Sequence, residues 1–261
     1  MPAIRVSGDV GRYLCGGQVP IKECMIYMTP PKVKNIMQFG EDDFLFDVNL
    51  LSADRKFING IKENDDRLKD FPDFMILMAV LNADGSLKSK LADFFAMVFP
   101  DYEVSLTKNS MDFVSISDNG ANGQVNQFNF KFFSRTLKEL FWPPKKSEDE
   151  YNPANAKAEE IARKLEKGRE LASRSRGEVA GGKGSIFGLY ASVVSIGTGV
   201  SVNVLYDYTP FQLYDAFTRY VTKVSYDFYM KIKTTPMMDL GDAEEPDQWI
   251  ANLYEEAGTD E

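Results

Sequence analysis

A long stripe of apolar residues with helical spacing constrains the fold of this 261-residue chain more than any other feature. Its members follow one another in steps of three or four residues, which places them on one face of a helix. They are Leu213, Phe217, Val221, Val224, Phe228 and Ile232. Thr209 provides an N-cap hydroxyl and Pro210 suits a first turn, while Pro236 ends the pattern. The sequence therefore predicts a helix from Pro210 to about Lys233 that buries this stripe in the core.

Other segments also have the spacing or composition of helices. They are residues 30–51, 72–81, 87–99, 128–142, 153–173 and 186–196, with a last short helix around Trp249, Ile250 and Leu253. Thr29-Pro30 and Asn152-Pro153 repeat the pattern of Thr209-Pro210 and so predict two further helix starts. Gly40 interrupts the first of these helices. The helix at 186–196 is expected to be buried, because its residues are small and apolar.

The spacing changes between residues 102 and 117. The runs Tyr102-Glu103-Val104-Ser105-Leu106 and Phe113-Val114-Ser115-Ile116-Ser117 alternate with a period of two, and turn-forming residues flank them. This pattern predicts an antiparallel β-hairpin that packs on helices, with a third short strand near residues 124–126. The predicted fold class is mainly α with this small antiparallel hairpin: a helical body with a long C-terminal amphipathic helix.

Composition divides the chain into three regions. Pro143 and Pro144 precede a run of mixed charge at 145–150, and a segment rich in Gly, Arg and Ser spans 174–184. The helix predicted between them has a thin apolar stripe, so it is expected to pack on one side only. We therefore predict an N-terminal α/β-hairpin region at 1–142, a connecting helix and linker at 143–184, and a C-terminal helical region at 185–261.

Histidine is absent from the chain, which excludes histidine-based catalytic triads and histidine-ligated metals. The net charge of −9 disfavours nucleic acid as a partner. Residues 177–185 match part of a phosphate-binding loop, but Gly184 stands where that motif has Ser or Thr. The acidic clusters lack the spacing of a calcium loop. We predict no catalytic residue, no cofactor and no metal ligand; the distant alternative is a magnesium-dependent enzyme or a nucleotide-binding protein.

The two cysteines and the hydropathy pattern bear on location. Cys15 and Cys24 are expected to be reduced and unreactive, although a single disulfide between them remains an alternative. The first residues lack the apolar core of a signal peptide, and no apolar run is long enough to span a bilayer. The sequence therefore predicts a cytoplasmic protein without a membrane segment.

Nine Tyr and Phe residues lie between positions 206 and 229. Such enrichment suits either a large aromatic core or an interface with a partner, and both remain open. Tyr214 lies at the edge of the apolar stripe and Tyr229 lies beyond it. Together with Trp249, they are expected to form part of a binding patch, because exposed aromatic residues are favoured anchors in interfaces.

Short motifs that together resemble one class of protein occur along nearly the whole chain. They are Ile26-Tyr27, Thr29-Pro30, Ile36-Met37-Gln38-Phe39-Gly40-Glu41-Asp42, Asn126-Gln127-Phe128-Asn129-Phe130, Tyr151-Asn152-Pro153, Lys157-Ala158, Ile161-Ala162, Gly168-Arg169, Tyr208-Thr209-Pro210-Phe211-Gln212-Leu213-Tyr214-Asp215, Tyr226-Asp227, and Trp249 with Asn252. In these motifs the chain resembles the assembly proteins of tailed bacteriophages that are encoded among the tail and baseplate-hub genes.

The resemblance implies a chaperone-like protein that binds other phage tail or baseplate components without catalysis. Within the C-terminal motif, Leu213 is expected in the core, whereas Tyr214 and Asp215 are expected to face a partner. The alternative is a permanent structural subunit of the tail or baseplate. The protein would act in the host cytoplasm during assembly, or it would remain in the virion.

Overall fold

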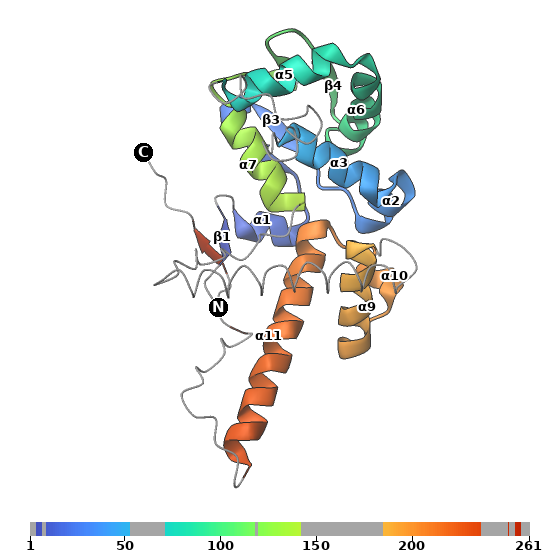
Figure 1. The fold of residues 1–261 in the computed structure, drawn as a ribbon, viewed down its shortest axis with the longest axis vertical. Coiled ribbons are helices and arrows are strands. Elements are labelled where there is room, and N and C mark those ends of the chain that lie inside the picture. The colour runs from blue at the N-terminus through green and yellow to red at the C-terminus, as the bar shows by residue number, and fades with distance from the viewer. Residues whose placement is uncertain are drawn as a thin grey trace, which may run out of the picture.

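The structure is a computed structural model, and it describes residues 4–6, 9–52, 71–117, 120–141, 185–235, 250 and 254–256. Helices dominate these residues, and strands form only small sheets. Figure 1 shows a body of helices and short strands from which one long C-terminal helix projects. The predicted fold class, mainly α with a small antiparallel β element and a long C-terminal helix, is confirmed.

The helices and strands of the described residues follow one another in mixed order along the chain. The α-helices are α1 (Val10–Cys15), α2 (Val33–Phe39), α3 (Glu41–Leu51), α5 (Asp73–Ala83), α6 (Gly85–Val98), α7 (Phe130–Phe141), α9 (Ile186–Thr198), α10 (Val202–Leu205) and α11 (Pro210–Thr234), and a 3-10 turn, η1, spans Lys22–Cys24. The strands are β1 (Ile4–Val6), β2 (Val19–Ile21), β3 (Ile26–Met28), β4 (Tyr102–Leu106), β5 (Met111–Ser115), β6 (Gly123–Val125) and β7 (Tyr254–Glu256).

The largest sheet has the strand order β4-β5-β6 and is antiparallel throughout. Its hairpin turn is closed by Thr107, whose backbone N–H donates to the Ser110 carbonyl and whose Oγ1 accepts from the Ser110 N–H at 3.1 Å. Met111 and Phe113 point to the inner face and are fully buried. Both the hairpin and the third strand near residue 124 were predicted from the alternating pattern, and both are confirmed.

The helix start predicted at Thr29-Pro30 is wrong. The first helical residue is Val33, after Lys32 in an extended conformation. The reason lies in Pro31: a residue that precedes proline is disfavoured in the helical region, so Pro30 cannot begin a helix. The predicted interruption is confirmed at Gly40, which has a φ of 112° and separates α2 from α3. The other predicted start, Asn152-Pro153, and its helix at 153–173 lie outside the described residues.

The two ends of the chain meet in a short parallel ribbon. Strand β1 pairs with β7 in the register Ile4 to Tyr254, a pairing that no pattern in the sequence predicted. Of the last helix predicted around Trp249, Ile250 and Leu253, only Ile250 is among the described residues, and its side chain is exposed. The N-terminal stretch forms α1, capped by the Asp9 carboxylate, and then β2, which pairs with β3.

An aromatic core fills the body between α3, α6, α7 and the β4-β5-β6 sheet. Phe99 and Phe113 lie at its centre, with ring centroids 4.9 Å apart and both side chains fully buried. Rings of α3, α6 and α7 extend the cluster on either side. They are Phe44, Phe94, Phe95, Phe133 and Phe141. Such ring pairs add to the stabilisation from apolar burial.

The C-terminal elements are joined to this body by contacts at several points. The Val33 N–H donates to the Tyr208 carbonyl at 2.8 Å. The Tyr13 and Phe211 rings meet edge to face, with centroids 5.2 Å apart. The Glu41 carboxylate accepts from the Ile186 N–H at the start of α9. The predicted division at residues 142 and 184 falls at the edge of, or among, residues that the structure does not describe, and it stays a prediction.

Candidate partner-binding surface

Helix α11 is firmly anchored at its N-terminus. The Thr209 hydroxyl accepts from the Gln212 N–H and the Gln212 side chain accepts from the Thr209 N–H, a reciprocal capping box. The Gln212 amide also donates to the Leu14 carbonyl at 2.6 Å, which ties the cap to α1. Phe211 and Leu213 in the first turn are buried. The helix predicted from Pro210 is confirmed, and its start is held by the body.

The apolar stripe of α11 becomes exposed along the helix. Leu213 is buried and Phe217 is partly buried, but Val224 is 47% exposed and Phe228 is 64% exposed. The prediction that the whole stripe belongs to the core is therefore wrong for Val224 and Phe228. The spacing identified one helix face correctly, but a face is covered only as far as another element extends along it.

Helix α9 is the element that covers the first part of this face. Its Tyr190 ring stacks on Phe217 at 4.3 Å between centroids. Near the end of α9, Gly197 lies directly against the Tyr220 ring, where any larger side chain would clash. Helix α9 ends at Thr198, and α11 continues beyond it (Figure 1). Beyond Tyr220, Val224 and Phe228 of the stripe are exposed, whereas Val221 and Ile232 are partly buried.

Helix α9 is itself only half buried, which corrects the prediction of a buried helix. Phe187, Ala191 and Val194 face inward, whereas Leu189 and Ile196 are well exposed. No charged side chain occurs from residue 184 to residue 206. An uncharged helix with exposed apolar residues is unusual for a free protein surface and is typical of a surface that binds a partner.

The start of α9 is held by a carboxylate from another helix. Glu41 Oε1 accepts from the Ile186 N–H at 2.6 Å and from the Phe187 N–H at 3.2 Å, and the Ser185 hydroxyl caps the Gly188 N–H. A negative charge at this position also interacts favourably with the helix dipole. Glu41, the first residue of α3, thus joins the start of α9 to α3.

The predicted partner-binding residues take different positions. Tyr214 is partly buried, with its ring centroid 6.1 Å from that of Tyr190, and burial raises the pKa of both phenols. Asp215 is buried, and its carboxylate accepts from Arg219 Nε at 3.0 Å and from the Tyr254 hydroxyl at 2.8 Å. Burial first, and the Asp215 charge second, raise the pKa of Tyr254. Asp215 therefore links α11 to β7 inside the protein.

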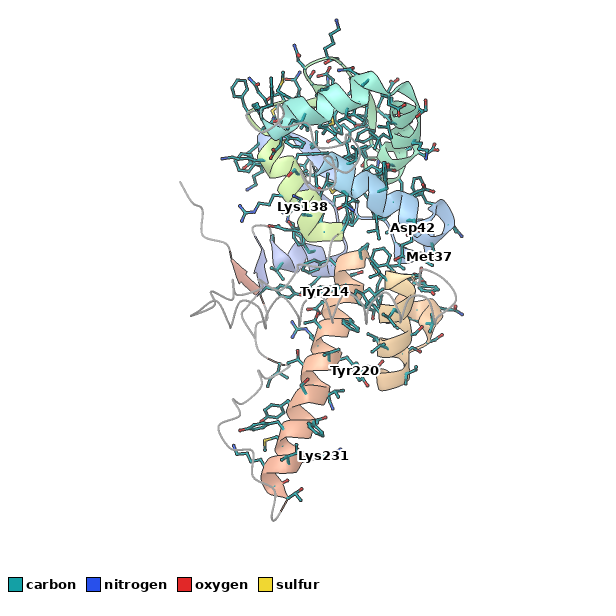
Figure 2. The ribbon with its side chains drawn as sticks, in the orientation of Figure 1. Met37, Asp42, Lys138, Tyr214, Tyr220 and Lys231 are labelled. Carbon is teal, nitrogen blue, oxygen red and sulfur yellow. The ribbon has the colours of Figure 1, made fainter. Side chains whose placement is uncertain are left out.

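Tyr229 lies in the projecting part of α11, where it is partly buried and the Lys233 ammonium lies 5.5 Å from its ring centroid. Fifteen residues separate it from Tyr214, or about 22 Å along a helix. Figure 2 labels Tyr214 near the body and Lys231 near the far end of the same helix. Trp249 lies outside the described residues. The structure does not bring these residues into one cluster, and their role in binding stays a prediction.

In the part of the chain that the structure describes, no three Cys, Asp or Glu side chains gather as a metal site would require. No helix of these residues is both long and apolar enough to cross a membrane. Of residues 177–185, only Ser185 is described, and it caps α9. Both cysteines are free, and burial raises the pKa of the Cys24 thiol to about 12.

Comparison of the chain with protein-family profiles, with curated proteins and with solved structures finds no match in any of the three.

The exposed apolar residues of α9 and α11 were not predicted from the sequence to lie at the surface. Val224 and Phe228 were assigned to the core, and Leu189 and Ile196 were assigned to a buried helix. For α9, the absence of charged residues predicted burial and gave no sign that Leu189 and Ile196 are exposed. For Val224 and Phe228, helical spacing does not reveal where the neighbouring helix ends.

Proposed function

We propose that this protein is a non-catalytic assembly factor of a tailed bacteriophage that holds tail or baseplate components by direct binding. One observation carries the binding role: apolar side chains are exposed on α11 and α9, two helices that are anchored to the body at their N-termini. The likeness of the sequence motifs to phage tail assembly proteins supplies the class of partner. The protein acts in the host cytoplasm while tails assemble.

Two features support binding over catalysis. The exposed apolar residues lie on regular helices, which present a preorganised surface and lower the entropic cost of association. Among the described residues, four side chains have a strongly raised pKa, and all four are buried among structural contacts. They are Tyr13, Cys24, Asp47 and Tyr254. Burial is the largest cause of the raised pKa in each of them. Neighbouring carboxylates of Glu139, Asp43 and Asp215 add to it at Tyr13, Asp47 and Tyr254 respectively.

The test is genetic and biochemical. Deletion of the gene from the phage is expected to yield particles that lack tails, and expression of the chain from a plasmid is expected to restore them. Normal tails in the deletion strain would contradict the proposal. Mass spectrometry of purified virions then separates the two forms of the function: absence from the virion supports an assembly factor, whereas stoichiometric presence supports the alternative of a permanent tail or baseplate subunit.

A further inference from the structure

The exposed stripe on α11 is a continuation of the surface that binds α9. With 3.6 residues per turn, Phe217, Val221, Val224 and Phe228 lie within about 60° of one another around the helix axis. Phe217 is stacked under Tyr190 of α9. The face that this protein uses to pack one of its own helices therefore runs on, without change of direction, past the end of that helix. We call Val221, Val224 and Phe228 the distal face of α11.

The form of the distal face indicates what can bind there. Steps of four and three residues between apolar positions are the spacing that a second helix needs to pack along the first. Helix α9 occupies the first part of the stripe in this way, with Gly197 allowing close approach at Tyr220. A helix from a partner, laid end to end with α9 along α11, would extend this packing and bury Val224 and Phe228.

The charges beside the distal face indicate which charged residues the partner helix would carry. Lys223 donates to Asp227 at 2.7 Å, and both side chains are about half exposed, so this pair is neutral. Lys231 follows on the same side of the helix, where it is exposed near the far end of α11 (Figure 2). The edge of the face thus carries a net positive charge. A second copy of the chain would bring the same sign of charge, whereas carboxylates on a partner helix would be complementary.

We propose that the distal face of α11 docks an amphipathic helix of a partner protein, whose apolar stripe is flanked by Asp or Glu residues that meet Lys231. This inference rests on the proposed function, because it names the part of a tail component that the protein holds. The partner helix packs on Val224 and Phe228 in the extension of α9, and its carboxylates set its position along α11.

The experiment uses two synthetic peptides and the purified full-length protein. Both peptides are helices of about 20 residues with Leu at the same 3–4 spacing. One carries Glu beside the Leu stripe, and the other carries Lys at the same positions. Binding is measured by fluorescence anisotropy. The Glu peptide is expected to bind more tightly than the Lys peptide, and Lys231→Glu is expected to reverse this preference.

Matched variants locate the site. Phe228→Ala is expected to weaken binding of the Glu peptide about tenfold or more, and Val224→Ala somewhat less, because both truncate the contact surface. Val204→Ala is the control: Val204 is 49% exposed, like Val224 at 47%, but lies on α10. All three changes remove exposed atoms, so the melting temperature should stay unchanged and binding alone should differ.

Three results would overturn the inference. They are an absence of binding by the Glu peptide, equal effects of Val204→Ala and Phe228→Ala, and a dimer in sedimentation analysis that Phe228→Ala dissociates, since the last would make a second copy the occupant. These outcomes are independent of the proposed function, which is tested by tail formation in the deletion strain. Restored tails with the Phe228→Ala protein would reject the docking site and leave the assembly role intact.

Discussion

The carboxyl group of Asp47 makes the stability of this protein depend on pH near neutrality. Asp47 lies on α3 and is only 3% exposed. The pKa of Asp47 is raised to about 7: burial is the largest cause, the charge of Asp43 one turn earlier also raises the pKa, and Lys90 lowers it. The ionised form is thus strongly disfavoured in the folded protein, whereas the unfolded chain ionises near the ordinary value of 3.8.

The sign and size of the effect follow from linkage. Between pH 3.8 and about 7, the folded protein holds the Asp47 proton and the unfolded chain does not, so the free energy of unfolding falls as the pH rises through this window. Each unit of pKa corresponds to about 1.4 kcal/mol. The full cost of ionising Asp47 is therefore about 4 kcal/mol above pH 7, of which about 3 kcal/mol appears between pH 5 and pH 8.

Asp47→Asn isolates this effect, because asparagine has nearly the same shape and does not ionise. Urea unfolding followed by circular dichroism is measured at intervals from pH 5 to pH 8. Between pH 5 and pH 8, the free energy of unfolding of the variant is expected to rise by about 3 kcal/mol relative to that of the wild type. Asp43→Asn should move the midpoint of the change to lower pH, and Lys90→Met should move it to higher pH. Parallel stability curves for the wild type and Asp47→Asn would refute the reasoning.

Three further predictions concern contacts that join the elements. Glu41→Ala removes the acceptor at the start of α9 and should lower the free energy of unfolding by about 1 kcal/mol in urea titrations, with Glu41→Gln as a milder control. Tyr254→Phe removes a buried hydrogen bond to the Asp215 carboxylate and should cost about 2 kcal/mol in the same assay. Phe113→Ala should cost about 3–5 kcal/mol, because it opens a cavity at the centre of the aromatic core; a loss below about 1 kcal/mol by calorimetry would contradict the packing described.

Local signals predicted the local structure well. The capping box at Thr209 involves residues three apart, so the sequence contains all of its parts. The β4-β5 hairpin has its strands joined by a short turn, and its period of two is visible in one window. Thr29-Pro30 failed for an equally local reason, since Pro31 opposes helix at the residue before it. For structure that depends on residues close in sequence, capping and periodicity patterns predict correctly once the residue that follows each motif is also considered.

Long-range contacts were beyond such rules. Strands β1 and β7 contribute three residues each from opposite ends of the chain, and no pattern in three residues identifies a partner about 250 positions away. The burial of Asp215 has the same origin: Arg219 is one turn along α11, but the Tyr254 hydroxyl comes from β7. The residues of α11 alone therefore give no sign that the Asp215 carboxylate has a hydrogen-bond partner in β7.

The projecting half of α11 shows how a helix can remain ordered while its apolar face is exposed. A helix without packing must be sustained by its own side chains. Lys223 and Asp227 pair at i,i+4, Lys233 lies over the Tyr229 ring, and lysines in the last turn interact favourably with the helix dipole. Each contact contributes only a few tenths of a kcal/mol to about 1 kcal/mol, but they act on a helix whose other end is anchored by the capping box. Burying Phe228 fully would contribute about 1.5–3 kcal/mol, and the free protein leaves most of this unrealised. A helix ordered in advance and still able to bury apolar surface binds a partner without first having to fold, which lowers the entropic cost of association.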